Sequence, residues 1–501
     1  MAQPSNADLL HDFYTTRLEE RLARHRRQAP GAAAIALCRE AAEHVPAYRA
    51  FLQAHQIDPG AVGDHTALAS LPLMTKDNYM RAHPLPARCR GGRIEDSEIV
   101  AFSSGSTGRP MLWPRGLGHE LDIAWRFEQI FRDAFGADRR STLAVVCFPM
   151  GTWVGGVYTA ACCRYLAQKG YPLTLATPGN NKDEIFRVVE ELGPHFDQVA
   201  LLGYPPFVKD ALDTGAARGI EWPRYRPKLV FAGEVFTEEW RDLVCRRIGS
   251  EAPWHDTASL YGTADAGVLG NETPLSIAVR RFLARHPGAA RALFGESRLP
   301  TLVQYDPLSR YFEVSEDTLA VTADNGVPLI RYHIADRGGI VDYAGMLDFV
   351  RRHGAELTAE LAPRDPHERY ALPFVYLFGR ADFTLSYYGA NIYPENVSVA
   401  LEQPSVTQWV SGKFVMEVRP AGDGDARLAV AVELLPGVSA EERIGQALSA
   451  SILQQLRRLN SEFAHYVPED RQAPMVSLHP FGDPDYFPPG VKHRYTRRPT
   501  A

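Results

Sequence analysis

The sequence lacks three features that would mark a secreted or membrane protein. Its six cysteines show no C-x-x-C spacing, which leaves neither a redox pair nor the usual zinc-ligand pattern. No apolar run reaches the roughly 18 residues that a membrane span needs. The N-terminus has no basic start followed by an apolar stretch, so we expect no signal peptide. These absences predict a cytoplasmic protein with reduced, mostly buried cysteines and no membrane partner.

Positive charge is not in excess either. The chain has 54 Lys and Arg against 60 Asp and Glu, a formal net charge of −6, so we expect no nucleic-acid partner. Its hydrophobic content of 45% and charged content of 23% are typical of a globular protein. At 501 residues it is too long for one ordinary core, and we expect two or more domains.

Short apolar runs alternate with helical patterns between about residues 97 and 380, which predicts α/β layers. Candidate buried strands lie at 143–149, 198–205 and 227–234, and a helical pattern follows the last of them at 237–248.

Two later regions differ from this pattern. Residues 310–339 alternate in polarity and contain Asn325-Gly326, which indicates a hairpin or small β unit. After 377–383 come short strands and a helix over 440–460. We therefore expect an α/β protein with a large N-terminal domain of layered sheets and helices, residues 1–378. A small, mobile C-terminal α+β domain, residues 379–501, would follow it.

The stretch "SSGSTGRP" (103–110) cannot pack a core, because it consists of small, hydroxylated and turn-forming residues. Such a loop can present backbone N–H groups and hydroxyls to a phosphate, although a plain linker has a similar composition. The Gly-Lys-Ser/Thr ending of the Walker A motif is absent. If the stretch is a phosphate loop, it is of another type.

The stretch resembles the phosphate loop of the adenylate-forming superfamily, which includes acyl-CoA and aryl-CoA ligases. "FAGE" (231–234) resembles that family's adenine-binding segment, and "LYGTADAG" (260–267) its Tyr-Gly-x-Thr-Glu motif. "IRYHIADRG" (330–338) resembles the segment that supplies an aspartate to the ribose. "FGRADFTLSYYGANIYPENV" (378–397) is similar to the hinge motif. "LPLMTKDNY" (71–79) is similar to the phenylacetate-CoA ligase branch in particular, and the segments follow the family's order.

The resemblance implies an enzyme that uses ATP to convert a carboxylic acid to an acyl-AMP and then passes the acyl group to coenzyme A. It implies ATP and Mg²⁺ as cofactors, with the acid and coenzyme A as small-molecule partners. Other outcomes stay open: an amine or a carrier protein as acceptor, a small oxyanion such as nitrite activated for diazotisation of an aryl amine, or a nucleotide-binding protein without turnover. The sequence identifies neither the acid nor the oligomeric state, and a homodimer stays open.

Residue roles carried over from the family give a candidate site. The expected phosphate and nucleotide contacts are Ser103, Ser104, Gly105, Ser106, Thr107, Gly108, Gly233, Glu234, Tyr261, Gly262, Thr263, Asp336 and Arg380. Asp265 stands where the family has a Mg²⁺-binding glutamate, and a carboxylate oxygen suits that ion. Lys492, after a Pro-Pro-Gly turn, is the candidate catalytic lysine, although a solvated basic tail would look similar. Asp382 matches the hinge position.

The acyl pocket is expected between the central strands. The candidate substrate-contacting residues are Trp153, Gly155, Tyr204 and Ala232. Flat aromatic walls would favour an aromatic acid over a long alkyl chain, although aromatic residues near a sheet are usually core. One departure is Ala264, where the family usually has a hydroxyl that touches the α-phosphate.

Overall fold

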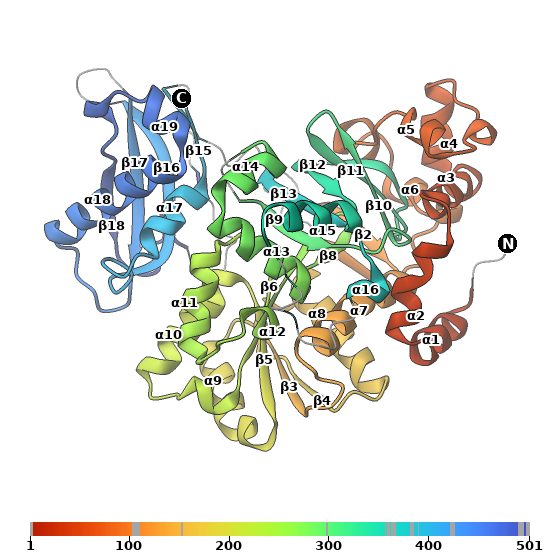
Figure 1. The fold of residues 1–501 in the computed structure, drawn as a ribbon. Coiled ribbons are helices and arrows are strands. Elements are labelled where there is room, and N and C mark those ends of the chain that lie inside the picture. The colour runs from red at the N-terminus through yellow and green to blue at the C-terminus, as the bar shows by residue number, and fades with distance from the viewer. Residues whose placement is uncertain are drawn as a thin grey trace.

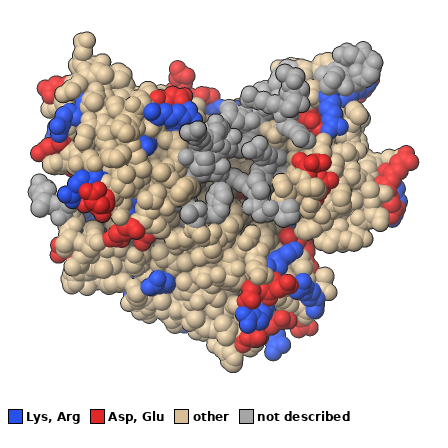
Figure 2. Space-filling model, turned by 180° about the vertical axis from the view of Figure 1, so that it is seen from behind, with Lys and Arg blue, Asp and Glu red and all other residues tan. Residues whose placement is uncertain are grey.

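The protein folds into a large layered unit and a smaller C-terminal unit beside it (Figure 1). The computed structural model describes residues 4–102, 111–151, 154–296, 299–355, 357, 361, 367–380, 385–388, 390–420, 426–488 and 495–496. Figure 2 shows that acidic and basic side chains are mixed over the face seen from behind, without one continuous field of either sign.

A mixed sheet runs through the large unit. Within the described residues it has 11 strands in the order β10-β11-β12-β13-β9-β8-β7-β6-β5-β3-β4. Neighbouring strands from β4 to β7 are parallel, and the pairs from β7 to β10 are antiparallel. The strands are β3 (Thr142–Val146), β4 (Leu173–Ala176), β5 (Gln198–Gly203), β6 (Lys228–Ala232), β7 (Thr257–Thr263), β8 (Gly267–Asn271), β9 (Thr301–Gln304), β10 (Arg310–Ser315), β11 (Thr318–Ala323), β12 (Leu329–Val341) and β13 (Phe374–Arg380).

Helices cover both faces of the parallel half, as its continuously apolar strands require. One face packs on α7 and α8, and the other on α9, α10 and α11. From residue 117 on, the helices of this unit are α7 (Leu117–Gln129), α8 (Val154–Gln168), α9 (Lys182–Leu192), α10 (Pro205–Ala217), α11 (Glu238–Ile248), α12 (Pro253–Asp256), α13 (Pro274–Arg285), α14 (Pro287–Phe294), α15 (Tyr343–Arg352) and α16 (His367–Tyr370).

The N-terminal residues form short helices that lie against the β10–β12 side of the large unit (Figure 1). These are α1 (Asn6–Thr15), α2 (Leu18–Ala23), α3 (Ala32–His44), α4 (Pro46–Ala54), α5 (His65–Ala69) and α6 (Leu85–Arg88). Side-chain caps mark the starts of two of them. Ser5 forms a capping box with Asp8 at α1, and Asp64 caps α5.

The stretch 103–110 lies outside the described residues, but the strands on either side of it pair with each other. β1 (Ile99–Phe102) and β2 (Leu112–Arg115) are antiparallel, with Phe102 opposite Leu112. The segment between them therefore joins the two strands of a hairpin. This is the connection that the sequence analysis assigns to phosphate binding.

The expected hairpin within 310–339 is confirmed, but Asn325-Gly326 does not act as a tight two-residue turn. Residues 324–328 connect β11 to β12. Neither Asn325 nor Gly326 has a positive φ, so the turn type that favours this dipeptide is absent here. A Cβ at Gly326 would lie 2.1 Å from the Pro114 carbonyl oxygen. This glycine is needed because β2 passes so close.

The small unit has its own hydrophobic core, drawn from residues 387–467. The strands β16 (Val410–Pro420), β17 (Ala426–Leu434) and β18 (Met475–His479) form one sheet, in which β17 and β18 are parallel. The remaining elements are the hairpin β14 (Leu385–Tyr387) and β15 (Ala390–Ile392) and the helices α17 (Pro394–Leu401), α18 (Glu442–Leu459) and α19 (Ser461–Tyr466). The domain boundary after residue 378 stays a prediction; β13 still pairs with β12 at Arg380.

Candidate active site

Several predicted site residues follow the carboxyl ends of neighbouring parallel strands. Tyr204 follows β5, Gly233 follows β6, and Asp265 follows β7. These strands are adjacent and parallel, so the three residues come to one edge of the sheet. Ligands of open α/β sheets bind beyond that edge.

Two aspartates and two tyrosines join β7 to β12 in a reciprocal way. The Tyr261 hydroxyl donates to Asp336 Oδ2 at 2.7 Å, and the Tyr332 hydroxyl donates to Asp265 Oδ2 at 2.7 Å. Each aspartate therefore accepts from a tyrosine of the other segment. Both segments are predicted to bind the same nucleotide, and these two hydrogen bonds hold them side by side.

Asp336 sits where β12 departs from regular geometry. The pairing of β12 with β13 shifts register between Asp336 and Gly338, and Ala335 has a φ of +65°. Non-glycine residues in this region are strained, and bulges of this kind re-aim side chains near functional sites. Arg380 lies directly opposite Asp336 across the strands, as expected for two groups at one ribose, but its side chain lies outside the described residues.

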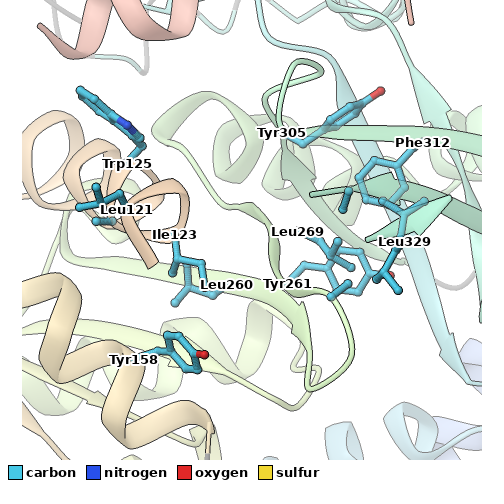
Figure 3. Close-up of a cluster of buried hydrophobic side chains, with 14 of the residues drawn as sticks. Leu121, Ile123, Trp125, Tyr158, Leu260, Tyr261, Leu269, Tyr305, Phe312 and Leu329 are labelled. Atoms are coloured by element: carbon cyan, nitrogen blue, oxygen red, sulfur yellow. The ribbon is translucent and has the colours of Figure 1, made fainter. Parts of the chain in front are cut away.

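Tyr261 is buried, with 6% of its surface exposed. Its ring stacks on Phe312, with 6.4 Å between centroids and 20° between planes, and Leu269 and Leu329 lie beside the pair (Figure 3). One role of Tyr261 in this arrangement is to orient Asp336. Its expected contact with adenine stays a prediction.

Asp265 carries a second contact that the sequence analysis does not assign. The Lys76 ammonium lies 3.1 Å from Asp265 Oδ2, and the aspartate side chain is only 7% exposed. Lys76 belongs to "LPLMTKDNY", a stretch noted only for its family resemblance. The resemblance of this stretch to a family motif indicated that its lysine could be functional. No sequence rule predicts that the lysine pairs with Asp265.

Backbone pairing brings Lys76 to this position. The Met74 amide donates to the Arg331 carbonyl at 3.2 Å, and the Met74 carbonyl accepts from the His333 amide at 2.9 Å. Met74 thus pairs in parallel with Tyr332, on the strand that also carries Asp336. Thr75 then caps the turn 76–80 through Asn78 and directs the chain away.

A buried arginine supports the turn that carries Asp265. Arg115, at the end of β2, donates from Nη2 to the carbonyls of Ala264 at 2.6 Å and Asp265 at 3.1 Å. Its Nη1 donates to His119 Nε2 at 2.5 Å. Burial lowers the pKa of Arg115 to about 10, and burial next to this cation holds the pKa of His119 well below its usual range. His119 is therefore neutral, with Nε2 as acceptor.

The turn itself needs glycine and a hydroxyl. A Cβ at Gly262 would lie 2.8 Å from the Gly267 carbonyl oxygen, so this position admits no side chain without a shift. The Thr263 hydroxyl accepts from the Ala266 amide at 3.0 Å. Thr263 closes the turn around Ala264 and Asp265, and its predicted nucleotide contact is a separate role that stays a prediction.

Asp265 fits Mg²⁺ as a single-carboxylate ligand. Lys76 and Tyr332 both contact Oδ2, and the carboxylate is a hard oxygen donor. Within the described parts of the chain, no group of three His, Cys, Asp or Glu side chains could hold a metal. Proteins commonly bind Mg²⁺ by one or two carboxylates, with substrate phosphates and water completing the shell. The residues thus fit an ion that arrives with a nucleotide.

Aromatic side chains gather beside the ends of β3, β5 and β6. Phe148 and Tyr204 meet edge to face, with 5.0 Å between centroids. Gly233 has a φ of +87°, and a Cβ there would lie 2.7 Å from the Tyr204 ring. Ala232 and Gly155 are partly exposed next to this cluster, and Gly155 faces the Phe148 ring. The structure thus brings the predicted Tyr204, Ala232 and Gly155 to one region beside the buried Phe148. Their contact with a substrate stays a prediction.

Several predicted site residues lie outside the described part of the chain. They are Ser103, Ser104, Gly105, Ser106, Thr107, Gly108, Trp153, Asp382 and Lys492. Their roles stay predictions.

Comparisons with known proteins reveal the fold. No protein-family model matches the chain, and no curated protein matches it. Among solved structures, 2-hydroxyisobutyryl-CoA ligase in the postadenylation state with 2-HIB-AMP gives a TM-score of 0.63 at 16% identity, covering 93% of this chain and 88% of that one. The same ligase with 2-HIB-AMP and CoA in the thioesterification state gives 0.51 at 16% identity, covering 99% and 94%.

The likeness extends over nearly the whole length of both chains. Among the described helices, none is long and apolar enough to cross a membrane. The large layered sheet followed by a small C-terminal unit is the fold of the adenylate-forming enzymes.

Proposed function

We propose that the protein activates a carboxylic acid with ATP and transfers the acyl group to coenzyme A. The observation that carries the proposal is the reciprocal pairing of Tyr261 with Asp336 and of Tyr332 with Asp265. It supports one nucleotide site at the carboxyl edge of the sheet, with a ribose acceptor and a metal ligand side by side. The structurally similar 2-hydroxyisobutyryl-CoA ligase, whose structure contains 2-HIB-AMP and CoA, has the same fold.

In the first step a carboxylate oxygen attacks the α-phosphorus of ATP, and pyrophosphate leaves. Asp336 would accept hydrogen bonds from the ribose hydroxyls while Tyr261 holds its carboxylate in place. Mg²⁺, held by Asp265 and the phosphates, would offset phosphate charge. Lys492 would bring positive charge to the reacting oxygens. In the second step the sulfur of coenzyme A attacks the acyl carbon, the thiol proton passes to solvent, and AMP leaves as the bond between the acyl carbon and the AMP oxygen breaks.

The proposed substrate is an aromatic acid, as in the phenylacetate-CoA ligase branch. The partly exposed Tyr204 supports this choice, because flat rings bind flat ligands with little ordering cost, while Phe148, 1% exposed, packs behind it in the core. Because Gly233 has no side chain, the Tyr204 ring can lie directly against its backbone.

Pyrophosphate release tests the proposal. The purified chain is incubated with ATP, Mg²⁺ and a panel of aromatic and aliphatic acids, with and without coenzyme A. We expect release with an aromatic acid, and a thioester by mass spectrometry when coenzyme A is present. Release with an acid but no thioester would indicate an amine or a carrier protein as the acceptor. Release that needs nitrite in place of an acid, with an aryl amine as the attacking group, would indicate diazotisation. Nucleotide binding without release for any acid would overturn the enzymatic proposal.

A further inference from the structure

We propose that Tyr495 is a positioning residue for the adenylation step. It ties the C-terminal segment of the small unit to Glu234 of the large unit, and a second tie joins Thr237 to Glu402. This inference rests on the proposed function for its catalytic consequence, but the ties themselves are contacts between described residues.

Tyr495 is anchored within the small unit. The Met416 amide donates to the Tyr495 carbonyl at 2.7 Å, and Met416 also pairs in parallel with Thr496. The Tyr495 ring lies against Phe414, with 5.2 Å between centroids. Phe414 and Met416 are both fully buried on β16, inside the core of the small unit. Tyr495 must therefore move with that unit.

The Tyr495 hydroxyl reaches the large unit. It donates to Glu234 Oε2 at 2.5 Å, across 261 residues of sequence. Burial and the Glu234 charge raise the pKa of Tyr495 far above its usual range, so the hydroxyl stays a donor at any working pH. Glu234 directly follows Gly233, at the carboxyl end of β6. The bond ends at the segment that the sequence analysis assigns to adenine binding.

The second tie is made by Thr237, three residues after Glu234 in the connection between β6 and α11. The Thr237 hydroxyl caps α11 by accepting from the Trp240 amide at 3.1 Å. It donates its proton to Glu402 Oε2 at 2.9 Å. Glu402 ends α17, so this bond also joins the two units. The connection between β6 and α11 is thus held by the small unit at both Glu234 and Thr237.

Contacts of this kind exist in one arrangement of the two units and break in any other. Lys492 is three residues before Tyr495, and three residues of chain span at most about 11 Å. The tie at Tyr495 therefore limits how far that lysine can travel from Glu234. It would favour the arrangement in which acid and ATP react.

Tyr495→Phe removes the hydroxyl and leaves the ring on Phe414. A hydrogen bond to a charged group commonly corresponds to a tenfold to hundredfold effect on an equilibrium. We expect acyl-AMP formation, followed by ATP–pyrophosphate exchange, to slow by about tenfold or more. Thioester formation from a supplied synthetic acyl-adenylate should stay within about twofold of the parent. The matched control is Tyr387→Phe, whose hydroxyl donates to the Arg471 carbonyl at 2.8 Å inside the small unit.

A second readout needs no substrate. Hydrogen exchange of peptides covering 233–240 should quicken in Tyr495→Phe, because the connection between β6 and α11 loses its hydrogen bond from Tyr495 to Glu234. Unchanged exchange and unchanged adenylation would overturn the inference. So would equal loss of both half-reactions, which would mark a purely structural role. A parent that releases no pyrophosphate with any acid refutes the proposed function instead, and the exchange experiment still decides whether the tie exists.

Discussion

Replacing Asp336 by Asn tests the nucleotide site at its best-defined point. The carboxylate is 5% exposed and accepts from Tyr261 at 2.7 Å. Asparagine keeps the shape and one acceptor oxygen but removes the charge and presents an N–H₂ group to a ribose hydroxyl. Losing one charge-assisted hydrogen bond costs about 1.5–3 kcal/mol, which weakens ATP binding by roughly tenfold to hundredfold.

Isothermal titration with a non-hydrolysable ATP analogue measures this change directly. Asp306→Asn is the matched control, because Asp306 is 1% exposed and pairs with Arg126 at 3.8 Å rather than with a predicted nucleotide contact. The control should lower thermal stability and leave nucleotide affinity unchanged. If Asp336→Asn folds normally and binds the analogue as tightly as the parent does, Asp336 does not contact the ribose, and the assignment of residues 330–338 is wrong.

Four other substitutions test separate parts of the account. Asp265→Asn should slow adenylation by tenfold or more at limiting Mg²⁺, because an amide is a poorer ligand than a carboxylate, and added Mg²⁺ should partly restore the rate; equal rates at low Mg²⁺ would exclude Asp265 as a ligand. Lys492→Ala should abolish acyl-AMP formation but spare thioester formation from a supplied adenylate, whereas Asp382→Pro should do the reverse because its φ is fixed; equal loss in both steps would mark a structural tail. The pKa of Glu402 is raised from an ordinary 4.5 to about 8, mainly because the side chain is buried. The Glu239 charge also raises this pKa, whereas the hydrogen bond from Thr237 and the Lys209 charge lower it. The folded protein therefore binds this proton more tightly than the unfolded chain does. The resulting stabilisation is complete below about pH 4.5 and is lost as the pH rises to about 8, by at most about 1.4 kcal/mol per pH unit. Glu402→Gln should flatten this part of the urea-unfolding pH profile, and an unchanged slope would contradict the assignment.

The parallel strands could be predicted from sequence because burial on both faces leaves a plain signal. The run 143–149 became β3, 198–205 became β5, and 227–234 became β6, each within a few residues of its expected bounds. Continuous apolar runs bounded by turns carry that information locally. The same held for the helix after β6, where Thr237 supplies the cap.

The side-chain contacts of the site could not be predicted in the same way. Lys76 reaches Asp265 only because Met74 pairs with Tyr332, more than 250 residues later. No local pattern specifies a contact of that range. The predicted contact of Tyr261 with adenine stays a prediction, and no sequence pattern indicated that its hydroxyl donates to Asp336.

The ties between the two units share this limit. Tyr495 and Glu402 look like ordinary residues of a tail and a helix end, and their partners Glu234 and Thr237 are distant in sequence. Gly326 shows a different limit. The Asn325-Gly326 pair predicted a hairpin that is present, but the turn preference on which that prediction rested is not used there. The close approach of Pro114, rather than a turn requirement, explains the glycine.

Transfer of labelled oxygen tests the central claim most directly. An acid that supports pyrophosphate release is labelled with oxygen-18 in its carboxylate and incubated with the protein, ATP, Mg²⁺ and coenzyme A. Attack of the carboxylate on the α-phosphorus predicts AMP that carries one labelled oxygen atom, with an equal amount of thioester. Unlabelled AMP, or ADP and phosphate in its place, would contradict adenylation of the acid.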